Sequence, residues 1–188
     1  MSDLRPGALR LASRSIHSGR VVDLSLDRVR LPNGREVEVE LVHHRGAAAV
    51  LPLVPAPGGH GAEEVVLLRQ YRYPTGGWLL EIPAGTLQGD EAPEQCARRE
   101  LEEETGMAAE ELEPLGWIWT TPGFCDEKIW LYAARAVPGP GADLDADEVL
   151  EIERLPLAEA VARAVRGEIH DGKSVCALLR LAARRGLL

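Results

Sequence analysis

One stretch of the chain, residues 85 to 107, constrains the fold more than any other. Pro93 suits the first turn of a helix, where its missing N–H leaves no hydrogen bond unmade. Gly106 suits the left-handed position just past a helix end. The two signals predict a helix from about Pro93 to Thr105, entered from a glycine-containing loop over 85–91.

Three glutamates share one face of this predicted helix. Glu100, Glu103 and Glu104 stand at positions i, i+3 and i+4, which are neighbours on a helix surface. Their like charges repel by roughly 0.2–0.5 kcal/mol per pair. A divalent cation such as Mg²⁺, which prefers carboxylate oxygens, would turn that repulsion into a binding site. The alternative interpretation is a solvated acidic face on a surface helix.

The spacing of the whole stretch resembles the Nudix box, G-x5-E-x7-R-E-U-x-E-E-x-G-U, where U is aliphatic or bulky and apolar. Its defined positions are filled by Gly85, Glu91, Arg99, Glu100, Leu101, Glu103, Glu104, Gly106 and Met107. The chain therefore resembles the Nudix hydrolases, which use Mg²⁺ or Mn²⁺ to hydrolyse a nucleoside diphosphate linked to another moiety. The resemblance implies that Glu100, Glu103 and Glu104 ligate the metal. It also implies that Arg99 orients them, through Glu103 on the next helical turn.

Strand patterns fill the first part of the chain. Period-2 alternation predicts strands at 13–17, 21–30 and 35–43. Asn33-Gly34, between the last two, is the strongest short hairpin signal. In Nudix members that act on ADP-ribose a similar sheet pairs across a two-fold dimer, so the resemblance implies a homodimer formed through residues 1–44. The alternative is an edge extension of the main sheet within one subunit.

The remaining residues, 45–188, are expected to form the hydrolase domain. The resemblance implies an α+β fold: a Nudix-type α/β/α sandwich with a mixed sheet, in addition to the small N-terminal antiparallel β-sheet. Apolar runs predict strands at 45–54, 64–73, 78–84, 112–121 and 128–136.

Two amphipathic stretches near the C-terminus predict helices. The first, 156–168, is expected to place four apolar residues toward the core: Leu157, Val161, Ala164 and Val165. The second, 173–185, has Ser174 as its candidate N-cap.

Arg69 and Arg72 lie near the end of a predicted buried strand, where an unpaired charge is unfavourable. Arginine binds phosphate bidentately, and pairing with Glu81 or another acid is the alternative. Glu81 interrupts an apolar run and itself needs a donor, either an arginine or the exocyclic amine of a base. The stretch from 69 to 85 resembles R-Q-Y-R … E-x-P-A-G of the ADP-ribose subgroup. That resemblance implies substrate contacts at Arg72 and Glu81, and a metal contact from the Ala84 carbonyl.

A proline beyond the box carries a subgroup signal. Pro122 lies 16 residues after Gly106, a spacing that marks ADP-ribose pyrophosphatases, and the Gly-Phe-Cys-Asp-Glu-Lys that follows is similar to members of that subgroup. The resemblance implies that Pro122 and Phe124 contact the substrate. A proline between two strands is also favoured on turn grounds alone.

An acidic loop rich in glycine and proline follows at 138–148. Loops held by a rigid scaffold often carry catalytic groups. In ADP-ribose members this loop supplies a glutamate that polarises water or adds a metal ligand, so the resemblance implies that Glu148 is the general base. The alternates are Asp145, Asp147 and Glu151. A merely solvated acidic loop is the other interpretation.

Composition limits the partners. The net charge is −9, from 30 acidic and 21 basic residues, which argues against a nucleic-acid binder because such proteins show a basic patch. The sequence has no run of about 18 apolar residues that would predict a membrane span. Three cysteines without C-x-x-C spacing favour reduced thiols in the cytoplasm. Arg10, Arg14 and Arg20, with few acidic residues near them, give a transit peptide as the alternative.

The resemblance therefore predicts hydrolysis of the pyrophosphate bond of ADP-ribose or a related nucleoside diphosphate sugar, giving AMP and ribose 5-phosphate. Mg²⁺, or Mn²⁺, is the expected cofactor. One alternative is a pyrophosphatase for another dinucleotide or sugar nucleotide, such as FAD, NADH or GDP-mannose. The other is a non-catalytic nucleotide-binding module, which would be expected to lack a box carboxylate, and none is missing.

Overall fold

The computed structural model describes residues 7–58, 62–144 and 149–188. Contacts within the chain divide it into two compact units. The N-terminal unit comprises Met1–Gly46 together with Trp119–Lys128, and the sandwich unit comprises Ala47–Ile118 together with Ile129–Leu188.

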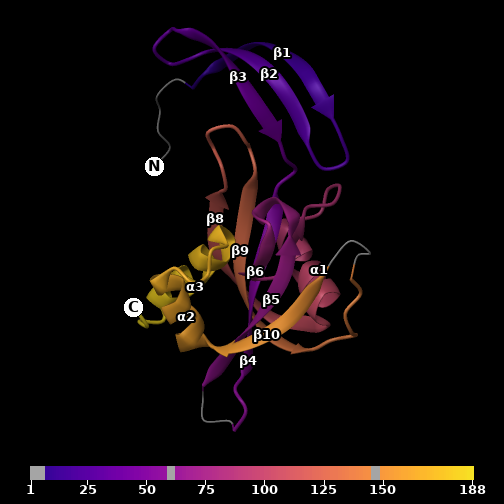
Figure 1. Cartoon of the computed structure of the whole chain (residues 1–188), viewed down its shortest axis with the longest axis vertical. Coiled ribbons are helices and arrows are strands. Elements are labelled where there is room, and N and C mark those ends of the chain that lie inside the picture. The colour runs from indigo at the N-terminus through magenta and orange to yellow at the C-terminus, as the bar shows by residue number, and fades with distance from the viewer. Residues whose placement is uncertain (1–6, 59–61, 145–148) are drawn as a thin grey trace. The chain divides into compact units, whose positions relative to one another are not determined.

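A three-stranded antiparallel sheet forms most of the N-terminal unit (Figure 1). Its strands, in spatial order, are β1 (Leu9–Ser18), β2 (Asp23–Arg30) and β3 (Glu36–His43). In the turn between β2 and β3, Gly34 has φ 83° and its N–H donates to the Leu31 carbonyl at 2.8 Å. The predicted small antiparallel sheet is confirmed, and so is its hairpin turn.

The segment 119–128 belongs to this unit because its backbone pairs with the end of β3. The Val42 N–H donates to the Phe124 carbonyl at 2.8 Å, and the Asp126 N–H donates to the Val42 carbonyl at 3.1 Å. The Asp126 carboxylate also lies 2.9 Å from Nδ1 of His43. The division expected from sequence, at residue 44, did not foresee this pairing because its partners are far apart in the chain.

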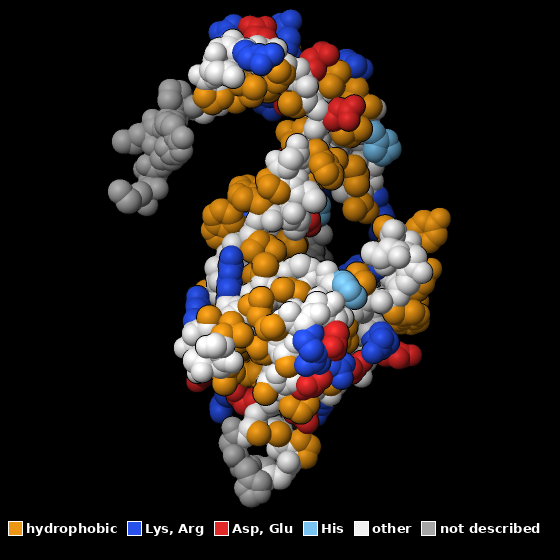
Figure 2. Space-filling view, turned by 60° about the vertical axis from the view of Figure 1, so that its left-hand side comes forward, with side chains coloured by type: hydrophobic (Ala, Val, Ile, Leu, Met, Phe, Trp, Pro, Cys, Tyr) orange, Lys and Arg blue, Asp and Glu red, His pale blue; other side chains and the backbone are white. Residues whose placement is uncertain are grey.

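The most buried side chains of the small sheet are polar. Asp27, only 3% exposed, accepts hydrogen bonds from Ser13 Oγ at 2.5 Å and from Ser25 Oγ at 2.9 Å. Several apolar side chains of this region are instead exposed: Leu9, Ile16, Val21, Val22 and Val39. Figure 2 shows hydrophobic side chains on the surface of the small sheet. A sheet of this kind lacks an apolar core of its own.

A seven-stranded mixed sheet runs through the sandwich unit. The strands are β4 (Ala47–Pro55), β5 (Glu63–Arg72), β6 (Gly77–Glu81), β7 (Ala84–Thr86), β8 (Met107–Trp119), β9 (Lys128–Pro138) and β10 (Leu150–Pro156). Their order is β10-β5-β4-β9-β8, with β6 paired to β5 and β7 paired to β4. The sheet is mixed because β4 is parallel to β9 and antiparallel to β5.

Three helices cover the two faces of this sheet: α1 (Pro93–Thr105), α2 (Leu157–Arg166) and α3 (Gly172–Arg184). The central strand β4 is buried on both faces. Ala49 and Leu51 belong to the core shared with α2 and α3, whereas Ala48 and Val50 belong to the core shared with α1, as expected from the alternation of side chains along a strand. The α/β/α sandwich is therefore confirmed (Figure 1). None of the described helices is both long and apolar enough to cross a membrane.

The helix predicted from the box is present with the expected bounds, and Gly106 ends it with φ 69°. The predicted strand at 78–84 is wrong in its extent. It is divided into β6 and β7, because Pro83 has no N–H to continue a ladder.

Two expectations for the C-terminal helices are also wrong. Val165 is 62% exposed, since the core side of α2 is the narrower stripe of Leu157, Ala160, Val161 and Ala164. The N-cap of α3 is Asp171, whose carboxylate accepts from the Ser174 N–H. Ser174 lies inside the first turn, fully buried.

Candidate active site

Arg99 organises the acidic face of α1. Its Nη1 donates to Glu100 Oε1 and to Glu103 Oε2, both at 2.7 Å. Its Nε and Nη2 hold both oxygens of Glu91, at 2.9 and 3.1 Å. Hydrogen bonds from Arg99 lower the pKa of Glu91 and, conversely, the contact with Glu91 raises the pKa of Arg99. The expected Arg99–Glu103 contact is present, and Glu91 is a further partner that the sequence analysis left without a role.

The backbone of β7 approaches the same helix face. A Cβ on Gly85 would lie 2.6 Å from Glu100 Oε2 and would overlap that residue's Oε1 and Cδ. Only glycine leaves room for the Glu100 carboxylate at this point. Glu100 is 8% exposed, so its carboxylate is held between the Gly85 backbone and Arg99.

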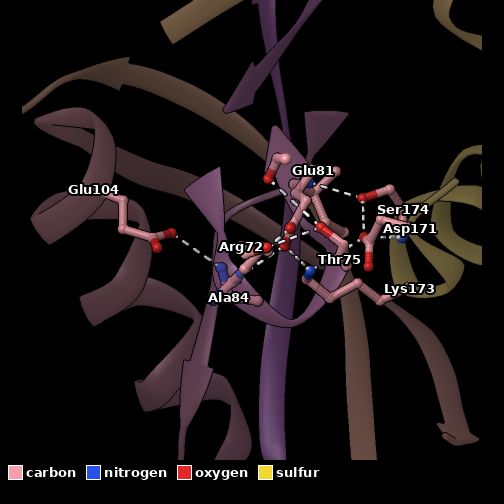
Figure 3. Close-up of polar contacts among 10 residues, drawn as sticks. Arg72, Thr75, Glu81, Ala84, Glu104, Asp171, Lys173 and Ser174 are labelled. Atoms are coloured by element: carbon pink, nitrogen blue, oxygen red, sulfur yellow. Dashed lines mark hydrogen bonds and ion pairs between the residues drawn. The ribbon is translucent and has the colours of Figure 1, made fainter. Parts of the chain in front are cut away.

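Glu104 is hydrogen-bonded to the backbone of Ala84, the residue before Gly85. Its Oε2 accepts the Ala84 N–H at 3.0 Å, a contact between α1 and β7 that is drawn in Figure 3. The side chain is only 2% exposed. The Ala84–Gly85 peptide therefore lies against both Glu100 and Glu104.

The donor chemistry of this face fits a hard divalent cation. Arg99 and the three carboxylates that it contacts, those of Glu91, Glu100 and Glu103, carry a formal charge of −2. Oxygen ligands and excess negative charge are what Mg²⁺ requires. Within residues 7–58, 62–144 and 149–188, no three His, Cys, Asp or Glu side chains are gathered around one metal position. Arg99 and the Ala84 N–H bond the carboxylates of this face.

Arg72 and Glu81 form a bidentate pair at the ends of β5 and β6 (Figure 3). Nε and Nη2 of Arg72 each donate to one Glu81 oxygen at 2.9 Å. Lys173 Nζ also lies 2.5 Å from Glu81 Oε2. Burial raises the pKa of Glu81, but the hydrogen bonds and charges of the two cations outweigh it and lower that pKa below its usual value. The pairing that the sequence analysis gave as an alternative for Arg72 is thus observed.

Pro122 and Phe124 belong to the N-terminal unit. Phe124 is 56% exposed, and its carbonyl is bonded to the Val42 N–H. The box glutamates, Ala84, Arg72 and Glu81 all belong to the sandwich unit.

The acidic loop is anchored at both ends in the sandwich unit. The Asp143 N–H donates to the Glu103 carbonyl at 2.9 Å, and the Val149 carbonyl accepts from the Tyr71 N–H at 3.1 Å. Gly106 permits the close approach of the loop, since a Cβ there would lie 2.8 Å from the Ala142 nitrogen.

The proposed base Glu148 and its alternates Asp145 and Asp147 lie outside the described residues. The remaining alternate, Glu151, is exposed on β10, opposite Arg69.

Lys173, Asp171 and Ser174 are the polar residues of this site that sequence reasoning missed. They come from the first turn of α3 and its N-cap, more than 85 residues after Glu81 in the chain. One feature of the sequence could have pointed to Lys173. A lysine in the first turn of a helix opposes the helix dipole, which indicates that another group holds it there.

Comparison with known proteins agrees with this architecture. The family model for the NUDIX domain matches residues 43–178. The chain is 40% identical over 179 residues to a methanol dehydrogenase activator from Bacillus methanolicus, with 94% of each protein covered. It is 36% identical over 179 residues to an ADP-ribose pyrophosphatase from Bacillus subtilis (strain 168), again with 94% of each covered.

The fold is similar to that in a crystal structure of an ADP compounds hydrolase. The TM-score is 0.78 at 21% identity, and the match covers 97% of this chain and 98% of that one. Fold, box and similarities together define a hydrolase built as an α/β/α sandwich. The chain belongs to the Nudix family, which confirms the resemblance seen in the box residues.

Proposed function

We propose that this Nudix hydrolase cleaves the pyrophosphate bond of ADP-ribose or a related nucleoside diphosphate sugar, giving AMP and ribose 5-phosphate from ADP-ribose. The observation that carries the proposal is the close packing of Glu100 and Glu104 against the Ala84–Gly85 peptide. Arg99 donates a hydrogen bond to Glu100 at the same place. A relative that is 36% identical over 94% of both chains is named for this activity.

Mg²⁺, or Mn²⁺, is the proposed cofactor, with Glu100, Glu103, Glu104 and the Ala84 carbonyl as its ligands. When bound, such an ion neutralises phosphate charge and lowers the pKa of water. Arg99 sets the directions of Glu100 and Glu103, since one of its nitrogens contacts both carboxylates. Preorganisation of this kind keeps the ligands in place during the reaction.

Glu148 is the proposed general base. Its support is the anchoring of the loop: the described residue Asp143 is bonded to the Glu103 backbone, and Val149, next to Glu148, is bonded to Tyr71. The described residues on the two sides of Glu148 are thus bonded to α1, at a proposed metal ligand, and to β5, at the residue before Arg72. A carboxylate carried between those points has to reach the attacking water only in the bound complex.

Substrate contacts are proposed for Arg72 and Glu81 in the sandwich unit and for Pro122 and Phe124 in the N-terminal unit. Arg72 has the clearest support. Its pKa is raised by the hydrogen bonds to Glu81 and, to a smaller degree, by the charge of Glu104, so it lies within electrostatic reach of the metal face. A diphosphate bound at that face would carry the negative charge that arginine binds.

The choice among nucleoside diphosphate compounds is open to a direct test, since the two relatives described above carry different names. Purified protein is assayed with ADP-ribose, FAD, NADH, GDP-mannose and diadenosine polyphosphates, each with Mg²⁺ and with Mn²⁺. We expect the highest kcat/KM with ADP-ribose, and AMP and ribose 5-phosphate in equal amounts. A higher kcat/KM for FAD, NADH or GDP-mannose would replace the proposed substrate, and no turnover of any compound would favour a non-catalytic nucleotide-binding module.

We also propose a homodimer formed through the N-terminal sheet. Its support is that apolar side chains of the sheet, such as Ile16 (46% exposed) and Val39 (37% exposed), lie on the surface while its buried side chains are polar. A second copy would cover them.

The three cysteines are free thiols, which supports a cytoplasmic location.

A further inference from the structure

Glu81 is a buried carboxylate with more positive charge around it than its own charge requires. It is 2% exposed. Arg72 contacts both of its oxygens at 2.9 Å, which satisfies a carboxylate bidentately. Lys173 nevertheless lies 2.5 Å from Oε2. Figure 3 shows Glu81 between the two cations, with Glu104 of α1 to one side and α3 to the other.

Lys173 occupies a position that a lysine does not favour on local grounds. It is the second residue of α3, where a positive charge opposes the helix dipole, and its side chain is only 9% exposed. Confining a lysine side chain in this way also costs rotamer entropy. The contacts with Glu81 and, at 3.1 Å, with Asp171 hold it there.

Asp171 and Ser174 fix the position of this lysine relative to β6. The Asp171 carboxylate caps α3 by accepting the Ser174 N–H at 3.0 Å. The Ser174 hydroxyl donates to Asp171 and accepts from the Ile82 N–H at 2.8 Å. The residue after Glu81 is therefore tied to the start of α3, and the negative charge of Asp171 is offset by the N-terminus of that helix.

Charge balance then decides what Arg72 can bind. A bidentate Arg72–Glu81 pair is neutral as a unit and attracts an anion weakly. Addition of Lys173 gives the trio a formal charge of +1. Removal of Lys173 would leave Arg72 as the sole counter-charge of Glu81, so the pair would be neutral and would attract a phosphate weakly.

We propose that Lys173 is a positioning residue for the substrate diphosphate: it neutralises Glu81, so that Arg72 retains a positive charge for the phosphate. The inference rests on the proposed function in naming a diphosphate. Lys173 acts through Glu81 and does not touch the reacting atoms, so it governs substrate affinity and not the chemical step.

Three full-length variants test the proposal. Lys173→Met removes the charge with little change in length. The double variant Glu81→Gln/Lys173→Met removes both charges, so Arg72 is again uncompensated. Arg184→Met is the matched control, because it removes a positive charge from the same helix at a side chain that is 47% exposed and pairs with Glu113. KM and kcat for ADP-ribose are measured at saturating Mg²⁺, together with Tm.

We expect Lys173→Met to raise KM about tenfold, equivalent to ~1.4 kcal/mol, with kcat within about twofold. The double variant should have a lower KM than Lys173→Met, a departure from additivity that reports the coupling of the two residues. Arg184→Met should leave KM and kcat unchanged. An unchanged KM in folded Lys173→Met, or a double variant with KM as high as that of the single one, overturns the proposal. If Lys173→Met does not fold, the double variant decides: a KM raised about tenfold or more over wild type overturns the proposal, and a smaller rise supports it.

A second probe separates this proposal from the proposed function. Binding of inorganic pyrophosphate with Mg²⁺ is measured by calorimetry for wild type and the same variants. A Kd raised about tenfold in Lys173→Met, and lower again in the double variant, supports the role of Lys173 even if wild type does not turn over ADP-ribose. Equal Kd values in all variants refute that role even if ADP-ribose is hydrolysed.

Discussion

Substitution of Gly85 by alanine would test the close approach of β7 to α1. The added Cβ would overlap Oε1 and Cδ of Glu100 and lie 2.6 Å from Oε2. These atoms end a flexible side chain, so the carboxylate can swing away while the backbone stays in place. It then loses its 2.7 Å contact with Arg99, and a hydrogen bond to a charged group contributes about 1.5–3 kcal/mol. At ~2–4 °C per kcal/mol for a chain of this size, Tm should fall by about 3–12 °C.

The effect of Gly85→Ala on activity should be larger than its effect on stability. Displacement of a catalytic group by about 1 Å lowers a rate by about 10²-fold, and the Glu100 carboxylate must move at least that far. We expect kcat at saturating Mg²⁺ to fall about 10²-fold or more in a protein with a native circular dichroism spectrum.

Gly172→Ala is the matched control, because a Cβ at Gly172 meets nothing within 4 Å. It should leave kcat unchanged. If Gly85→Ala keeps kcat within about threefold of wild type, the position of the Glu100 carboxylate is not what requires glycine at this site.

Three further predictions concern the metal face, the substrate and the dimer. Glu104→Gln should lower kcat by orders of magnitude while the fold is kept, since a glutamine oxygen can still accept the Ala84 N–H; near-full turnover at saturating Mg²⁺ would contradict the metal assignment. Pro122→Ala should change the relative rates across the dinucleotide panel more than it changes Tm, and unchanged relative rates would count against a substrate role. The double substitution Ile16→Asp/Val39→Asp should halve the mass measured by sedimentation equilibrium, and a wild-type protein that is already monomeric would exclude the proposed dimer.

The acidic helix shows how far local patterns reach. Pro93 and Gly106 mark the two ends of α1 at the positions observed, because helix ends depend on residues within one turn. The Arg99–Glu103 contact is equally local, four residues apart on one helix. By contrast, the strand predicted at 78–84 is divided at Pro83, because proline has no N–H to donate to a neighbouring strand of the sheet.

The substrate side of the site was less accessible from sequence. Pairing of Arg72 with Glu81 was one of two alternatives that the sequence left open, and the contact of Lys173 with Glu81 was not foreseen. The assignment of 119–128 to the N-terminal unit was equally hidden, since it depends on hydrogen bonds between Val42 and residues Phe124 and Asp126.

The sequence by itself determined the family, the acidic helix with its glycine boundaries, and the sandwich of mixed sheet and helices. The acidic helix follows from spacings within a single element, where the period of a helix dictates which side chains share a face. The family and the sandwich were implied by the resemblance to the Nudix box. Only the tertiary structure decided that Gly85 is needed to admit Glu100, that Glu104 is held by the Ala84 backbone, and that α3 delivers a second cation to Glu81. Each of these contacts joins elements whose distance in space is set by packing, which no local spacing encodes.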